Sequence, residues 1–216
     1  MNLSEIRNLL REEDILLTRS LGQTFMHDQN QLRKIVGLAK LTAADHVIEI
    51  GPGLGSLTGL LLQTAGHVTA IETDRRLVKL LDERFGERGN FTLQHADAMK
   101  IVRKSEFDWS KHKLVANLPY SIASPLLIDL AESQGRPRAM IVTLQLEVVQ
   151  RMLAKPGTKE YGVLALLIGL HYAPGEWFTI PRVSFSPEPH VHCRCIPLPP
   201  PATPLFPPGP FPRFPH

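Results

Sequence analysis

A short apolar segment that ends in a glycine-rich loop constrains the fold of this chain more than any other feature. Residues 46–50 read His-Val-Ile-Glu-Ile, and residues 51–55 read Gly-Pro-Gly-Leu-Gly. A brief, β-branched apolar run that ends in glycine and proline predicts a buried strand. A helical pattern of leucines follows directly at residues 57–62. The segment therefore predicts the strand, loop and helix that begin an α/β fold.

Strand-like and helix-like segments alternate through the rest of the chain. Strands are predicted at residues 46–50, 67–71, 91–93, 113–116, 140–144 and 177–180, and helices at residues 3–17, 57–62, 75–85, 122–133, 145–154 and 161–172. Strands that are separated by helices favour a mostly parallel, doubly wound sheet with right-handed crossovers. We therefore expect one α/β domain over residues 1–195.

The last 21 residues differ sharply in composition from that domain. Ten of the residues 196–216 are proline. Proline fixes φ and has no N–H donor, which excludes helix interiors and central strands. The sequence predicts an extended, solvated tail over residues 196–216. Just before it, Val191, Cys193 and Cys195 alternate as one face of a last strand would.

Composition and charge leave most classes of partner open. Apolar residues make up 43% and charged residues 21% of the chain, and the net charge of +3 permits a nucleic-acid partner without requiring one. No run of about 20 apolar residues occurs, and the first residues lack the pattern of a secretion signal. We expect a cytoplasmic protein without a membrane span. Cys193 and Cys195 are too few for a disulfide framework, and we expect no metal site.

Candidate ligand-binding residues stand at the ends of three predicted strands, where parallel sheets bind ligands. The glycines at 51, 53 and 55 let the backbone approach a ligand, and Ser56 stands where a dinucleotide-binding loop would need glycine. Glu72 could accept both hydroxyls of a ribose, or be an ordinary exposed acid. Asp97 could accept from an adenine amino group, or cap a helix. Together they predict a nucleoside ligand without pyrophosphate, namely S-adenosylmethionine, and disfavour a nicotinamide dehydrogenase.

A fourth strand end carries the sharpest motif, Asn117-Leu118-Pro119-Tyr120. Pro119 would pin the turn so that the Asn117 oxygen and a main-chain carbonyl accept two hydrogen bonds from one amino group. Exocyclic amines of bases are weak nucleophiles, and two fixed acceptors favour the nitrogen that forms during methyl transfer. Tyr120 could stack on an extruded base. The alternative is an Asx turn beside a core tyrosine. Neither Cys193 nor Cys195 is expected near this site, which disfavours a cytosine C5 methyltransferase.

These motifs resemble those of the ribosomal RNA small-subunit adenine N6,N6-dimethyltransferase family (KsgA/Dim1 type). The resemblance extends over about residues 4–191 and is carried by residues 20–28, 49–55, 71–72, 96–98, 117–120, 144–151, 155–157, 161–162 and 185–191. It implies a Rossmann-like methyltransferase fold with a seven-stranded type of sheet, in which residues 1–28 form an N-terminal helix and entry motif. The family's helical C-terminal domain is expected to be missing, since His192 and Cys193 lead into the proline-rich tail.

The resemblance also implies an activity and a set of site residues. The activity is dimethylation of two adjacent adenosines in the 3′-terminal hairpin loop of small-subunit rRNA, within a pre-ribosomal particle during ribosome biogenesis, by a monomer. The residues implied to surround S-adenosylmethionine are Thr24, Met26, Gly51, Gly53, Glu72, Asp97 and Asn117. Those implied to hold the target adenine are Asn117, Pro119, Tyr120 and Phe185, where Phe185 packs on the far face of the base or is only a core residue.

Two alternatives to this activity stay open at the level of sequence. One is a large-subunit rRNA adenine methyltransferase of the antibiotic-resistance type. The other is an assembly factor that binds ribosomal particles without turnover. Basic side chains that could contact phosphate are Arg19, Arg103, Lys104, Lys111, Lys113, Arg151, Lys155 and Lys159.

Overall fold

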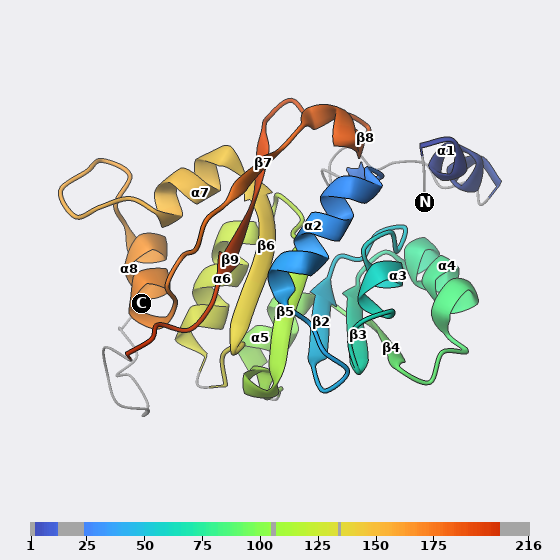
Figure 1. Ribbon diagram of the computed structural model, residues 1–216, viewed down its shortest axis with the longest axis horizontal. Coiled ribbons are helices and arrows are strands. Elements are labelled where there is room, and N and C mark those ends of the chain that lie inside the picture. The colour runs from blue at the N-terminus through green and yellow to red at the C-terminus, as the bar shows by residue number, and fades with distance from the viewer. Residues whose placement is uncertain (1–2, 13–23, 105–106, 134, 204–216) are drawn as a thin grey trace.

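The computed structural model describes residues 3–12, 24–104, 107–133 and 135–203, and it shows an α/β fold around one large sheet (Figure 1). The sheet has seven strands in the order β4-β3-β2-β5-β6-β9-β7. Its strands are β2 (His46–Ile50), β3 (His67–Glu72), β4 (Phe91–His95), β5 (His112–Asn117), β6 (Ala139–Gln145), β7 (Phe178–Ile180) and β9 (Cys193–Leu198). The first five are parallel, and β9 is antiparallel to both β6 and β7. The predicted mostly parallel, doubly wound sheet is confirmed.

Alternating side chains along the central strands build a core on each face of the sheet. On β2, Val47 packs toward one face, whereas Ile48 and Ile50 pack toward the other. The first face is covered by α2 (Gln29–Ala39), α3 (Thr58–Leu61) and part of α4 (Arg75–Phe85). The second is covered by α5 (Ala98–Lys104), α6 (Ala123–Glu132), α7 (Leu146–Met152) and α8 (Val163–His171) (Figure 1). Burial on both faces explains why these strands are apolar throughout.

Two short strands, two 3-10 turns and an N-terminal helix complete the fold. Strand β1 (Phe25–Met26) pairs antiparallel with β8 (Phe185–Ser186), which follows the 3-10 turn η3 (Arg182–Ser184). Helix α1 (Leu3–Glu12) places Ile6 in a small cluster with Phe25, Leu54, Leu77 and Leu80. A second 3-10 turn, η2 (Trp109–Lys111), precedes β5. No helix in the described ranges is long and apolar enough to cross a membrane.

Most predicted elements occur within a few residues of their predicted positions, but helix α5 was not predicted, and neither was helix α2. Asp28 caps it by accepting from the backbone N–H groups of Asn30 and Gln31. Leu32 and Ile35 are buried, at the helical spacing of three. The cap and the spacing were both available in the sequence. The helix predicted over residues 3–17 is present to Glu12, and residues 13–17 lie outside the described part.

The predicted start of the proline-rich tail at residue 196 is wrong by three residues. Strand β9 continues to Leu198, and both Ile196 and Leu198 are fully buried. Pro197 fits within this strand because its backbone polar groups point away from β6. Its carbonyl accepts from the Gly175 N–H at 2.9 Å on that side, and an N–H group at this residue would point the same way, so no bond to β6 is lost. The alternation of apolar residues therefore outweighs the proline content. Residues 204–216 lie outside the described part, so a tail there stays a prediction.

Candidate active site

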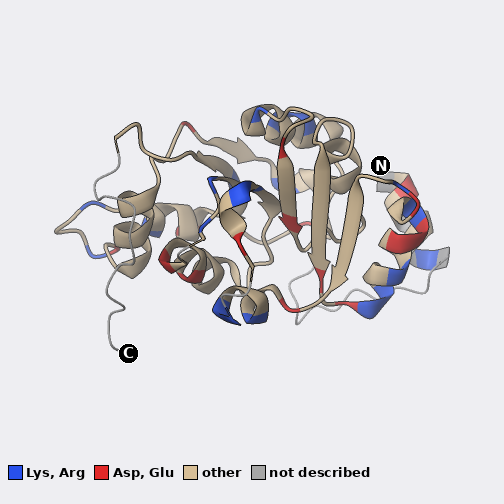
Figure 2. Ribbon diagram, turned by 90° about the horizontal axis from the view of Figure 1, so that it is seen from below, with Lys and Arg blue, Asp and Glu red and all other residues tan. Residues whose placement is uncertain are grey.

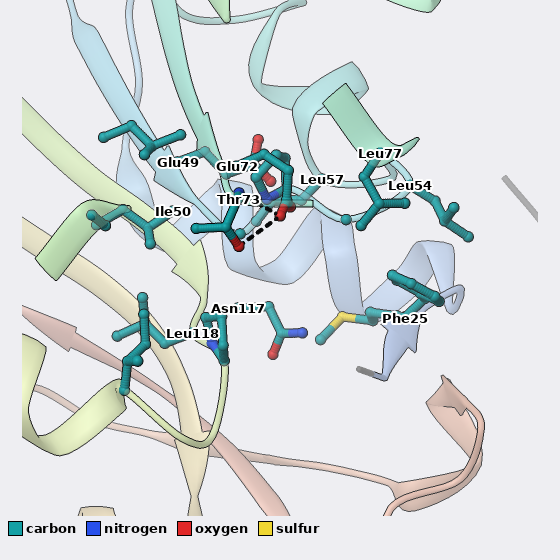
Figure 3. Close-up of a pocket in the computed structure, with 18 of the residues that line it drawn as sticks. Phe25, Glu49, Ile50, Leu54, Leu57, Glu72, Thr73, Leu77, Asn117 and Leu118 are labelled. Atoms are coloured by element: carbon teal, nitrogen blue, oxygen red, sulfur yellow. Dashed lines mark hydrogen bonds between the residues drawn. The ribbon is translucent and has the colours of Figure 1, made fainter. Parts of the chain in front are cut away.

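A cavity of about 260 Å³ opens at the carboxyl ends of β2, β3, β4 and β5. This is the edge at which doubly wound sheets bind ligands. It is lined by nine of the ten predicted site residues, namely Thr24, Met26, Gly51, Gly53, Glu72, Asp97, Asn117, Pro119 and Tyr120. The structure therefore brings together four loops and strand β1, which lie far apart in the sequence (Figure 3).

The glycine loop after β2 adopts a backbone that only glycine tolerates well. Gly51, Gly53 and Gly55 have φ values of +68°, +58° and +78°. A Cβ atom on Gly51 would lie 2.9 Å from Pro119 Cγ, and one on Gly53 would lie 2.8 Å from the Phe25 ring. The loop thus packs directly against two other walls of the cavity.

Glu72, at the end of β3, is a buried carboxylate in the cavity wall. It is 6% exposed, and its Oε1 accepts from the N–H group of Thr73 at 2.8 Å (Figure 3). It also accepts from the N–H group of Asp74 at 2.9 Å. Burial is the main cause that raises its pKa above the ordinary value, while these backbone bonds oppose the rise. The alternative of an ordinary exposed acid is wrong. A fixed, buried carboxylate is suited to accept from sugar hydroxyls.

Glu49 also lines the cavity, although the sequence had not singled it out as a site residue. It is 2% exposed, and its Oε2 accepts from the Thr58 hydroxyl at 2.6 Å. Burial, followed by the charge of Glu72, raises the pKa of Glu49 to about 8. Its signal in the sequence was a charged residue within an otherwise apolar strand.

Asp97 caps a helix, which is one of the two roles that the sequence offered for it. Its Oδ1 accepts from the Met99 N–H at 2.9 Å, which caps the start of α5. It also lines the cavity. Its contact with an adenine amino group stays a prediction.

Asn117, at the end of β5, contributes a buried hydrogen-bond acceptor to the cavity. Its Oδ1 is buried and has no hydrogen-bond partner in the structure. Its side chain reaches into the cavity (Figure 3). The alternative of an Asx turn is wrong, because such a turn would satisfy this oxygen with a backbone N–H. Since buried acceptors are almost always paired, a donor bound in the cavity would satisfy this oxygen. Ser56 Oγ, which also lines the cavity, is unpaired in the same way.

Tyr120 is half-buried and forms another wall of the cavity. The Thr24 hydroxyl donates to Tyr120 Oη at 3.4 Å, and Cys193 Sγ lies 3.1 Å from the same oxygen. The prediction that neither cysteine lies near the site is therefore wrong for Cys193, because β9 enters the sheet beside β6. Cys193 does not line the cavity, so the structure gives it no exposed nucleophilic role.

Phe185 is the one predicted site residue that the cavity does not include. It is 3% exposed, lies opposite Met26 in the β1–β8 ladder and packs within the core on the α2 side of the sheet. The structure thus shows the core position that the sequence offered as an alternative. Stacking of this ring on a base would require a displacement from that core.

Three of the candidate phosphate contacts form ion pairs within the protein. Lys113 donates to Asp45 at 3.2 Å, and Arg103 to Asp129 at 2.8 Å. The exposed Lys111 lies 4.0 Å from Asp108. In the view of Figure 2, positive and negative positions are interspersed over the helices. Arg19 lies outside the described part. The candidates that are exposed and have no acidic partner within the described ranges are Lys104, Arg151, Lys155 and Lys159.

The residues before and within β9 include types that could bind a metal, but the fold separates them. His190 and His192 are exposed, whereas Cys193 and Cys195 are fully buried. Within the described ranges, no group of three or more His, Cys, Asp or Glu side chains is arranged to hold a metal ion.

Comparison with known proteins identifies the family of this chain. Residues 16–211 match the family described as ribosomal RNA adenine dimethylase. The ribosomal RNA small subunit methyltransferase A of Lactococcus lactis is 40% identical over 88% of this chain and 68% of the relative. The protein of the same name from Syntrophus aciditrophicus is 35% identical over 93% and 73%.

Solved structures show the same likeness. A dimethyladenosine transferase from Plasmodium falciparum is 30% identical, with a TM-score of 0.71, over 82% of this chain and 63% of that one. The 23S rRNA methyltransferase ErmE is 26% identical, with a TM-score of 0.70, over 84% and 72%. The chain thus spans roughly two thirds of the length of these relatives. It belongs to the ribosomal RNA adenine dimethylase family.

Proposed function

We propose that this protein is an S-adenosylmethionine-dependent methyltransferase that dimethylates N6 of adenosines in small-subunit rRNA. The observation that carries the proposal is the buried, unpartnered Oδ1 of Asn117 in the cavity beside the glycine loop. An amino group is the donor that this oxygen lacks, and adenine presents one at N6. Membership of the family supports the same assignment.

The residues of the cavity fit the cofactor that the proposal requires. The glycine loop leaves no Cβ between the backbone and a ligand, Glu72 offers a carboxylate to ribose hydroxyls, and Asp97 offers one to an adenine amino group. Thr24 and Met26 close the wall opposite, on and beside strand β1. When bound, S-adenosylmethionine supplies an electrophilic methyl group on a sulfonium. No metal or covalent nucleophile is needed for its transfer.

The Asn117 loop would prepare the amino group of the target adenine. Asn117 Oδ1 and a main-chain carbonyl of the same loop would accept hydrogen bonds from the two N–H groups of this amine. These bonds stabilise the partly positive nitrogen of the transition state. Tyr120 offers a ring on which the extruded base stacks. Such stacking contributes about 1–3 kcal/mol per base, enough to offset much of the cost of extrusion.

The small-subunit assignment is the finer part of the proposal. Curated relatives of 35–40% identity carry the small-subunit name, whereas the 23S rRNA enzyme is 26% identical. We extend the proposal to two adjacent adenosines of the 3′-terminal hairpin loop, in a pre-ribosomal particle in the cytoplasm, with the protein acting as a monomer.

Transfer of labelled methyl groups tests the substrate. Purified protein is incubated with methyl-labelled S-adenosylmethionine and either small-subunit or large-subunit particles that lack the modification. Label in the small-subunit RNA, lost in Asn117→Ala, is the expected result. Label confined to large-subunit RNA would support the resistance-type alternative. Particle binding without any transfer would support the assembly-factor alternative.

A further inference from the structure

We propose that Cys193 is a positioning residue that sets the orientation of the Tyr120 ring. The inference rests on the proposed function, because it assigns Tyr120 to the target base. Cys193 itself touches neither the cavity nor its contents, so its effect passes through the phenol group of Tyr120.

The hydrogen bonds around Tyr120 Oη have a consistent direction. Thr24 donates its hydroxyl proton to Tyr120 Oη at 3.4 Å, which leaves the phenol proton free to be donated to Cys193 Sγ at 3.1 Å. The first of these is a weak contact, because it is longer than the range of about 2.5–3.0 Å for bonds between hydroxyl groups. The sulfur is therefore the closer of the two partners, even though sulfur is the larger atom.

The thiol belongs to a central strand, whereas the tyrosine belongs to a turn. Cys193 lies in β9 between two strands, opposite Gln145 of β6 and Ile180 of β7, and it is fully buried. Tyr120 lies in the turn between β5 and α6, outside any strand ladder. The bond therefore ties a residue of the loop to the sheet, and the sheet supplies the fixed point.

Both partners keep their protons at neutral pH. Burial raises the pKa of Tyr120, and the thiol beside it adds to the rise. Burial also raises the pKa of Cys193. The hydrogen bond between these two neutral groups therefore does not change with pH near neutrality, and the orientation of the Tyr120 ring should not change either.

Cys195 provides a matched control for Cys193. It lies two residues further along the same strand, is equally buried and packs in the same core cluster. Its neighbour across the β6–β9 ladder is Thr143, whereas the hydrogen bond to Tyr120 belongs to Cys193. Replacing either cysteine by alanine removes the same atom from the same core, so a difference between the two variants isolates the contact with Tyr120.

The first test observes the tyrosine ring directly, without cofactor or RNA. The chain has three tyrosines, Tyr120, Tyr161 and Tyr172, whose ring NMR signals can be assigned after labelling. Cys193→Ala is expected to shift the Tyr120 signals, Cys193→Ser to restore them toward the wild-type position, and Cys195→Ala to leave them in place. The inference is overturned if Cys193→Ala leaves Tyr120 unmoved or if Cys195→Ala moves it equally.

The second test measures methylation kinetics on small-subunit particles. Loss of one neutral hydrogen bond predicts a fall in kcat of roughly 2- to 10-fold in Cys193→Ala. Cys193→Ser and Cys195→Ala should stay close to wild type, and the affinity for S-adenosylmethionine should be unchanged in all three. Equal losses of kcat in both alanine variants would show that Cys193 contributes only to the packing of the core and does not orient Tyr120.

The two tests separate failure of this inference from failure of the proposed function. If wild-type protein transfers no methyl group, the proposed function fails, yet the NMR comparison still decides whether Cys193 orients Tyr120. If wild-type protein is active and Cys193→Ala behaves as Cys195→Ala does, only the inference fails.

Discussion

Gly51 and Pro119 are packed so closely that a single methyl group does not fit between them. A Cβ atom on Gly51 would lie 2.9 Å from Pro119 Cγ and 3.1 Å from its Cδ. Gly51 begins the loop proposed to hold the cofactor, and Pro119 belongs to the loop proposed to hold the base. The two loops therefore share one packing contact, and a change in either is expected to affect binding at both.

Gly51→Ala should destabilise the protein and abolish cofactor binding. A left-handed backbone costs an L-residue about 1–2 kcal/mol, and the contact with Pro119 adds to this. Gly37→Ala is the control, because no atom would lie within 4 Å of its Cβ and it lies within α2. There alanine should stabilise the helix by about 0.5–1 kcal/mol. Urea unfolding and calorimetric titration with S-adenosylmethionine check both variants, and equal stability of the two would contradict the packing argument.

Glu72→Gln should weaken cofactor binding while leaving the fold intact. It keeps the shape of the side chain but removes the charge that strengthens bonds to hydroxyl groups, each worth about 1.5–3 kcal/mol. The expected loss in affinity is roughly 10-fold or more. Glu83→Gln, an exposed change on α4, should leave the affinity unaltered. Unchanged affinity in Glu72→Gln would show that this carboxylate does not bind the cofactor.

The stability of the free protein should fall as pH rises because of Glu49. Its folded pKa is raised from 4.5 to about 8, so its contribution is complete below 4.5 and is lost as the pH rises toward 8. Glu49→Gln removes this titration. The difference in free energy of unfolding between wild type and variant should change by about 1.4 kcal/mol per pH unit within that window. Parallel curves for the two proteins would show that Glu49 ionises normally.

Asn117→Ala should separate stability from activity. Removing a buried oxygen without a partner should leave the free energy of unfolding unchanged or higher, since the desolvation cost disappears with it. Methyl transfer should fall by about 100- to 1,000-fold, as when a preorganised hydrogen-bonding group is removed from other active sites. Marked destabilisation would mean that Asn117 serves the fold.

Local sequence patterns were sufficient to predict the sheet and most of the cavity. β-branched runs predicted β2 and β3, and positions at strand ends predicted Glu72 and Asn117, because parallel strands bring their carboxyl ends to one edge. Those positions depend on a few neighbouring residues, so composition and spacing over a short window determine them.

What the sequence did not predict depends on contacts between distant segments. Cys193 meets Tyr120 across 73 residues, because β9 inserts antiparallel between β6 and β7. Nothing in the residues near Cys193 specifies that insertion. Phe185 likewise lies in the core through its pairing with Met26, and Ile196 lies in the sheet although prolines surround it. In each case tertiary packing, not local propensity, decides the position.

Mass spectrometry of the product tests the proposed dimethylation of adenine in small-subunit rRNA most directly. Unmodified small-subunit particles are incubated with the protein and S-adenosylmethionine, and the rRNA is digested to nucleosides. The proposed activity predicts N6,N6-dimethyladenosine with the wild-type protein and none with Asn117→Ala. Absence of methylated adenosine with folded wild-type protein, while a full-length family member modifies the same particles, would contradict it.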